Sequence, residues 1–159
     1  MSIYIIYLLI SIIFQLTFAE LLTINGFQPN IILLFIILSS ISMDNTSRAT
    51  VTGFIIGLFA DLLLFNGFYL GLSSLVFSVC SYLASQVSFN FAHRNFDLYW
   101  LVLVFVGTGL YSLFRYDFFF FNDMIFFLKN WFSVSLYTAF VGFIITRIFK
   151  VKQLVLEDA

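Results

Sequence analysis

One apolar stretch decides the fold of this chain, Thr52-Gly53-Phe54-Ile55-Ile56-Gly57-Leu58-Phe59-Ala60-Asp61-Leu62. Gly53, Gly57 and Asp61 follow one another at steps of four residues, so a helix places all three on one face. Two glycines on one face let a second helix approach closely. A carboxylate one turn further along is costly among leucine and phenylalanine side chains unless it has a partner. The stretch therefore predicts a helix that docks against another element.

The composition around this stretch points to a bilayer as the solvent. The chain has 159 residues, of which 62% are hydrophobic and 9% are charged, and its mean hydropathy is +1.09. A soluble domain carries about 25% charged residues. Long continuous apolar runs favour helices over the alternating strands of a membrane barrel. The sequence predicts an all-α integral membrane protein. Its formal net charge of −1, with no basic cluster, argues against nucleic acid as a partner.

Six apolar segments are candidates for membrane spans, each of which needs about 20 apolar residues. Asn66-Gly67 and His93-Arg94-Asn95 are interpreted as breaks between successive spans. The first segment is expected to be a retained span and not a cleaved signal peptide, because no Lys or Arg precedes it. The spans fill a single membrane domain over residues 1–159 and are expected near residues 3–22, 29–43, 50–65, 69–89, 98–115 and 130–149.

The basic residues of the loops predict the orientation of the chain, because cytoplasmic loops are enriched in Lys and Arg. With six spans, Arg115 and Lys129 fall on the outer side. The side shared by both termini carries Arg48, Arg94, Arg147, Lys150 and Lys152. Both termini are therefore predicted to be cytoplasmic.

An aromatic segment at residues 117–128 lies between the last two spans. It is too short to cross a bilayer and too apolar to lie in water. One interpretation is an anchor whose rings lie at the level of the lipid headgroups. The alternative is an element that docks onto a partner.

Asp61 is the acidic residue with the strongest claim to a specific role, and two kinds of partner remain open for it. Arg115 and Lys129 are expected at a similar depth, so one hypothesis is an ion pair with either of them. The alternative is that Asp61 caps or orients the Asn66-Gly67 turn, or pairs with another span.

A second stripe of small residues occurs in the span near 69–89, again at helical steps of three and four. Small residues and hydroxyls at helix interfaces in lipid permit close packing. The short Asn66-Gly67 connection makes the two small-residue faces neighbours, so they can pack on each other or receive a helix of another protein. The candidate set for helix packing or partner binding is Gly53, Gly57, Asp61, Gly71, Ser74 and Ser78.

No catalytic residue set is recognisable. The single Cys80 and single His93 exclude an internal disulfide and the common metal-ligand pairs. The chain has no phosphate-binding loop, nucleophile elbow or zinc-protease motif. The sequence therefore offers no catalytic set to name and no cofactor or metal site, and a protein that is not an enzyme is expected. An unrecognised membrane enzyme or proton carrier that depends on Asp61 stays open as an alternative.

The same residues resemble a known family. Gly53, Gly57 and Asp61, followed by Gly67 and a Leu70-Gly71 pair, resemble the pattern of MreD, the rod shape-determining membrane proteins of bacteria. The length of the chain and an apolar span beginning at Pro29 are also similar. The detailed likeness covers about residues 50–85. One departure is Ala60, where many members carry an amide.

The resemblance implies a function and a location. MreD-like proteins are non-enzymatic adaptors of the cell-elongation complex in the bacterial inner membrane, where they act with MreC. The complex also contains MreB filaments, the polymerase RodA and a class B penicillin-binding protein, which engages in peptidoglycan synthesis. Their six-helix fold is similar to the substrate-binding subunits of energy-coupling-factor transporters. Such a transporter subunit is therefore the alternative function, and the motif carries over to Gly53, Gly57, Asp61 and Gly71.

Overall fold

The computed structural model describes a set of helices. It covers residues 13, 15, 17, 21, 23–24, 27–43, 45–63, 70–86, 89–115 and 123–148, with the backbone alone for 89–95, 115 and 148. The helices are α2 (Ile31–Ile41), α3 (Thr46–Leu63), α4 (Leu72–Ser85), α5 (Phe89–Arg115) and α6 (Met124–Ile148). Ahead of them, Ile24 and Phe27 exchange two backbone hydrogen bonds. The predicted all-α class is confirmed for the described part of the chain.

Among the described residues, fewer helices than predicted are long enough to cross a bilayer. Within the described ranges, three helices are long and apolar enough: 46–63, 96–114 and 124–147. The helices α2 and α4 are apolar but shorter, with 11 and 14 residues. At 1.5 Å per residue α2 is about 16 Å long, roughly half the thickness of the hydrocarbon core. The first predicted span, near 3–22, lies mostly outside the described residues.

The helix that contains the fifth span extends beyond the span at its N-terminal end. Helix α5 starts at Phe89 and continues through His93, Arg94 and Asn95, where the sequence predicts a break. Its candidate membrane span covers 96–114, close to the predicted 98–115. His, Arg and Asn cost less than about 1 kcal/mol each within a helix, so only their polarity marks this region. A fall in hydropathy therefore marked the edge of the apolar segment and not the end of the helix.

The sixth span begins earlier than predicted, at Met124 instead of near residue 130. The Asp123 carboxylate accepts a hydrogen bond from the backbone N–H of Phe126 at 3.0 Å, which caps the first turn. Residues 124–128 of the predicted interfacial segment thus belong to α6, and residues 117–122 lie outside the described part.

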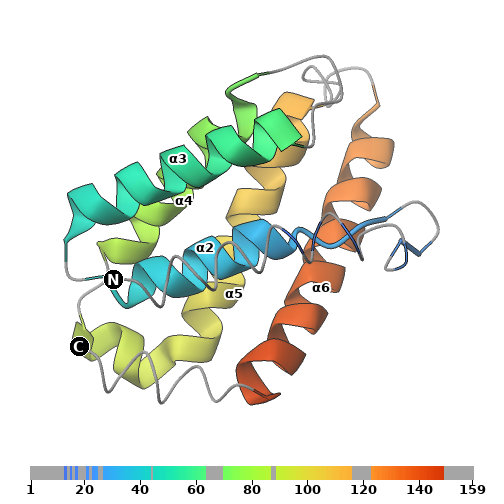
Figure 1. Ribbon diagram of the computed structural model, residues 1–159. Helices are drawn as coiled ribbons and strands as arrows, with labels where there is room; N and C mark the ends of the chain where they lie inside the picture. Colours follow the sequence, from blue (N-terminus) through green and yellow to red (C-terminus); the bar gives the residue numbers. More distant parts are fainter. Residues whose placement is uncertain are drawn as a thin grey trace.

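Helix α2 forms the centre of the core. Figure 1 shows it between the α3–α4 pair and α6, with α5 crossing behind it. Eight of its eleven residues are buried, and its apolar side chains surround the axis on every side. A helix that is apolar all round belongs inside a bundle or a membrane. Phe96, Trp100 and Val104 of α5 and Val76, Phe77 and Cys80 of α4 complete the core around α2.

The N-terminal end of α2 is held by polar side chains from distant parts of the chain. Asn30 caps it, with its carboxamide oxygen 3.0 Å from the N–H of Leu33. The buried Gln15 accepts a hydrogen bond from the N–H of Ile31 at 2.9 Å and donates one to the carbonyl of Pro29 at 3.2 Å. Non-helical backbone survives in an apolar medium only where its polar groups are satisfied in this way.

Replacing Gln15 with leucine is expected to lower the free energy of unfolding by about 2 kcal/mol, because the Pro29 carbonyl and the Ile31 N–H both lose their partner. Thermal unfolding of the purified protein in nanodiscs measures the change. Thr17→Val is the control, since Thr17 is exposed and its hydroxyl, as far as the described residues go, bonds to the carbonyl of Ile13 in its own helical turn. Equal melting temperatures for the parent and Gln15→Leu would contradict this role of Gln15.

Candidate functional site

The two glycines of the predicted docking face lie against α4 of the same chain. A Cβ atom placed on Gly57 would clash with the Cα of Ser74, and would lie 2.6 Å from the carbonyl carbon of Ser73. A Cβ on Gly53 would clash with the hydroxyl of Ser81 and lie 2.7 Å from the carbonyl oxygen of Phe77. The backbones of α3 and α4 therefore approach each other at a distance that only glycine allows. We call this contact the α3–α4 seam.

The serine stripe of α4 divides between the seam and other surroundings. Ser74 and Ser81 are buried against the glycines of α3. Ser78 is half-buried, and its hydroxyl donates to the carbonyl of Leu75 in its own helix. Of the two open interpretations, the contacts fit packing of the small faces within the hairpin. A partner helix therefore has no access to Gly53 and Gly57 in this arrangement.

Asp61 binds the N-terminal end of α4. One of its carboxylate oxygens, Oδ2, accepts hydrogen bonds from the backbone N–H groups of Gly71 at 2.9 Å and Ser73 at 3.1 Å. It also lies 3.4 Å from both the N–H and the hydroxyl of Ser74. The other oxygen, Oδ1, lies 3.1 Å from the N–H of Ser73. These N–H groups have no acceptor within their own helix, and the helix dipole favours a negative charge there.

Gly71 makes this geometry possible. It precedes α4 with a φ of +100°, a conformation that residues with a Cβ rarely adopt. In that conformation its N–H points at Asp61, as do the first N–H groups of the helix. Asp61 thus acts as the helix cap of α4, although it belongs to α3. The sequence left capping open for Asp61 but assigned it to the Asn66-Gly67 turn, which lies outside the described residues.

The predicted ion pair of Asp61 stays a prediction. Lys129 is exposed on the second turn of α6, and the side chain of Arg115 lies outside the described part. The partners of the Asp61 carboxylate given above all belong to the start of α4. These hydrogen-bond donors stabilise the carboxylate without a cation.

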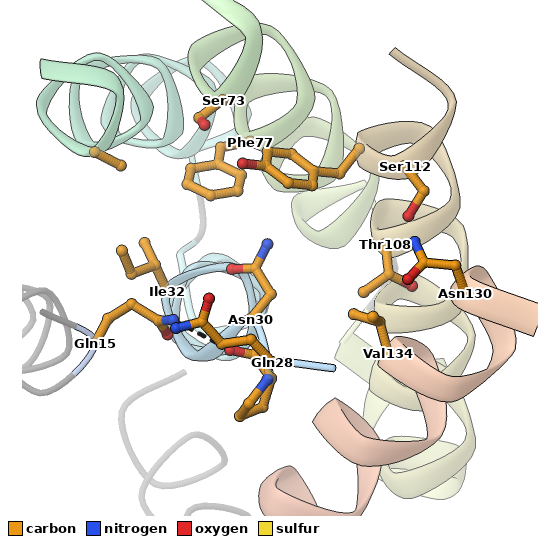
Figure 2. A pocket seen from close by; sticks show the side chains of 13 residues that line it. Gln15, Gln28, Asn30, Ile32, Ser73, Phe77, Thr108, Ser112, Asn130 and Val134 are labelled. Atoms are coloured by element: carbon orange, nitrogen blue, oxygen red, sulfur yellow. Dashed lines mark hydrogen bonds between the residues drawn. The ribbon is translucent and has the colours of Figure 1, made fainter. Parts of the chain in front are cut away.

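A polar cavity of about 160 Å³ lies beside the seam. Ala60 and Ser73 line it from α3 and α4, close to the Asp61 cap, and Phe77 adds an aromatic ring. Figure 2 shows Ser73 and Phe77 on one side of the space, Asn30 and Gln28 on a second, and Thr108, Ser112 and Asn130 on a third. Five helices and the residues before α2 thus contribute to one polar site within an apolar bundle.

Most of the polar residues of this cavity carried no recognisable signal in the sequence. Gln15 and Thr108 stand alone in apolar segments, and isolated polar residues of that kind have no motif. Their spacing does predict the face of the helix: Thr108 and Ser112 of α5 are one turn apart and both are buried. The hydroxyl of Thr108, which lines the cavity, contacts that of Ser135 of α6 at 2.6 Å and so joins the two helices.

Within the described ranges, no group of three or more His, Cys, Asp or Glu residues is close enough to hold a metal ion. The polar groups brought together here are backbone N–H groups, amides and hydroxyls. They bind and orient by hydrogen bonding, and the described site contains no nucleophile paired with a base.

Comparison with known proteins gives one match. A family model described as rod shape-determining protein MreD covers residues 1–155 of the chain. No curated protein and no solved structure shows a significant match.

Proposed function

Because the chain belongs to the MreD family of rod shape-determining proteins, we propose that it is a non-catalytic membrane adaptor of the bacterial cell-elongation complex. In this role it binds an MreC-like protein and links it to peptidoglycan synthesis. The family match, which extends over almost the whole chain, is the observation that carries the proposal. A RodA-type polymerase, a class B penicillin-binding protein and MreB-like filaments are its indirect partners.

The proposed location is the inner membrane, with the outer face of α3 in contact with lipid and the outer face of α6 available to lipid or to a partner within the bilayer. Both helices expose large apolar side chains, among them Phe54 and Phe59 of α3 and Leu136 and Phe140 of α6. The excess of Lys and Arg on one side supports cytoplasmic termini. In that orientation the Asp61 cap and the polar cavity lie toward the outer side of the membrane.

The complete fold is proposed to contain six membrane-embedded helices, with the first near residues 3–22 and with α2 and α4 as short members. Its likeness to the substrate-binding subunits of energy-coupling-factor transporters rests on the family resemblance alone. The polar cavity is the observation that favours the alternative function, a small-molecule-binding subunit of such a transporter. Co-purification of a pair of ATPases with a coupling membrane subunit would support that alternative.

The adaptor proposal predicts that the tagged chain captures an MreC-like protein from its native membranes, detected by mass spectrometry. We expect α6 to carry the interface, because only 17% of its span is buried in the bundle, compared with 28% for α3. Phe132→Ala combined with Phe140→Ala should reduce capture at least about fivefold, since large side chains dominate such interfaces. Van der Waals packing is one of the forces that drive the association of helices in lipid.

The matched control is Phe54→Ala combined with Phe59→Ala, two similarly exposed rings on α3, which should leave capture unchanged. Loss of capture with the α3 pair instead would move the interface to that helix. Failure of the parent chain to capture any MreC-like protein would overturn the adaptor proposal. Gly57→Leu is unsuitable for this experiment, because it disrupts the α3–α4 seam and not an outer surface.

A further inference from the structure

The polar cavity is lined by hydroxyls that the hydrogen bonds of the described residues do not use. Ser73 is 6% exposed and Ser112 is 4% exposed, and both line the cavity. The backbone N–H of Ser73 binds Asp61, but none of the hydrogen bonds among the described residues engages its hydroxyl or that of Ser112. The described side-chain atoms that are fully enclosed without a partner are instead Ser81 Oγ and Trp100 Nε1. The hydroxyls of Ser73 and Ser112 therefore remain accessible from the cavity, where an occupant can bond to them.

The cavity also presents amide groups from two sides. The carboxamide oxygen of Asn30 binds the N–H of Leu33, which leaves its NH2 group toward the cavity. Asn130 of α6 lies near Thr108 and Ser112 across the space (Figure 2). Gln28 is exposed at the edge of the cavity, where a ligand can enter. Donors and acceptors therefore surround the space without forming a closed network of their own.

Charge determines which ligands fit. None of the described residues that line the cavity is Lys, Arg, His, Asp or Glu. The nearby Asp61 is bound by the N-terminal end of α4, so its charge is already compensated. An ion moved into such a site would lose hydration without gaining a counter-charge. The occupant is therefore uncharged.

The size and the lining of the cavity narrow the class of ligand further. The cavity of about 160 Å³ is roughly ten times the 10–15 Å³ that one water requires. Phe77 and Tyr111 contribute apolar ring surface beside the hydroxyl and amide groups. A ligand site typically combines such an apolar wall with a few oriented polar groups. From this combination we infer that the cavity binds a single uncharged sugar ring, the small molecule that offers many hydroxyls together with an apolar face.

This inference is independent of the adaptor role, because it concerns a small-molecule site inside the bundle and not an outer surface. The test uses the full chain in nanodiscs without glycoside detergents, whose headgroups would compete. The probe is N-acetylglucosamine, which carries hydroxyls and an amide but no charge. Saturation-transfer NMR titration is expected to give saturable binding with a Kd on the order of 1 mM or tighter. Glucosamine, which has the same ring with an ammonium group, should bind at least about tenfold more weakly.

Two variants connect the binding to this cavity. Ser112→Ala removes one cavity hydroxyl, and Asn130→Leu removes one amide, and each should weaken binding about fivefold. Ser78→Ala is the matched control, because its hydroxyl lies on α4 outside the cavity and bonds within its own helix. Circular dichroism melting confirms that each variant is folded, and the variant of the pair that folds is the one interpreted.

The source of the sugar is distinguished by a second set of nanodiscs that contains monoglucosyldiacylglycerol. If this lipid competes with N-acetylglucosamine, the natural occupant is a lipid headgroup. If the lipid does not compete, the natural occupant is a free sugar. No saturable binding of N-acetylglucosamine would leave a cavity that holds water only and would overturn the inference. Binding that is equal for glucosamine, or unchanged by both cavity variants, would overturn it as well.

Discussion

Replacing Gly57 with leucine is expected to separate α3 from α4 and to lower the free energy of unfolding by at least about 3 kcal/mol. The atoms that a side chain at this position would meet are backbone atoms of Ser73 and Ser74, which cannot rotate away. For a chain of this size the loss corresponds to a fall in Tm of about 6–12 °C. Gly57→Ala should destabilise less but in the same direction, although alanine is the better helix former by about 1 kcal/mol. Thermal melting in nanodiscs measures both.

Gly107 supplies the matched control, because it is also a buried glycine within a helix. A Cβ at Gly107 would meet the Sγ of Cys80 at 2.8 Å and the Cδ2 of Leu33 at 3.0 Å, which are ends of side chains. These atoms can shift, so Gly107→Ala should cost less than Gly57→Ala. A Gly57→Leu protein that melts with the parent would contradict the close approach of the two backbones at the α3–α4 seam.

Replacing Asp61 with leucine should have an effect of similar size, about 3–5 kcal/mol. Three backbone N–H groups at the start of α4, those of Gly71, Ser73 and Ser74, then lose their acceptor. Each such group costs about 1–3 kcal/mol when it is left unsatisfied away from water. Asp61→Asn keeps one acceptor oxygen and should cost only about 1–2 kcal/mol. The Tm should therefore be highest for the parent, lower for Asp61→Asn and lowest for Asp61→Leu.

Asp97→Asn controls for the removal of a negative charge, because Asp97 is an exposed carboxylate on α5. It should melt with the parent. If Asp61→Leu and Asp61→Asn shared one Tm, the hydrogen bonds to α4 would not be the reason that Asp61 matters. A larger loss for Asp61→Asn in the presence of intact Arg115 than with Arg115→Ala would instead support the predicted ion pair.

The α3–α4 seam shows which parts of the site can be predicted from the sequence and which cannot. The four-residue steps of Gly53, Gly57 and Asp61 predict a docking face, since the period of a helix is fixed. The acceptor role of Asp61 toward α4 did not follow from those steps. It depends on the angle at which α4 begins, and that angle is determined by the left-handed backbone of Gly71. A sequence pattern indicates which residues share a face, but not the direction of an N–H group ten or more residues away.

The helix boundaries and the cavity were less accessible for a different reason. Hydropathy reports where side chains prefer lipid, so it missed the polar turn of α5 at 93–95 and the capped start of α6 at Asp123. The cavity is lined by residues of α2, α3, α4, α5 and α6 and by residues that precede α2. Helix α5 supplies three polar residues, α4 and α6 supply one each, and α2 and α3 supply apolar residues. Such residues look like exceptions in their own segment until the packing brings them together.

The start of α2 has a consequence for biosynthesis. The N–H of Asn30 donates to the hydroxyl of Thr138, a residue that lies 108 positions later in the chain. The ribosome synthesises Asn30 long before Thr138, so the central helix α2 leaves the ribosome before its hydrogen-bond partner in α6 has been made. Its eleven residues are also too few to be held by lipid on their own. The packing around α2 can therefore be completed only near the end of synthesis, after α6 has been made.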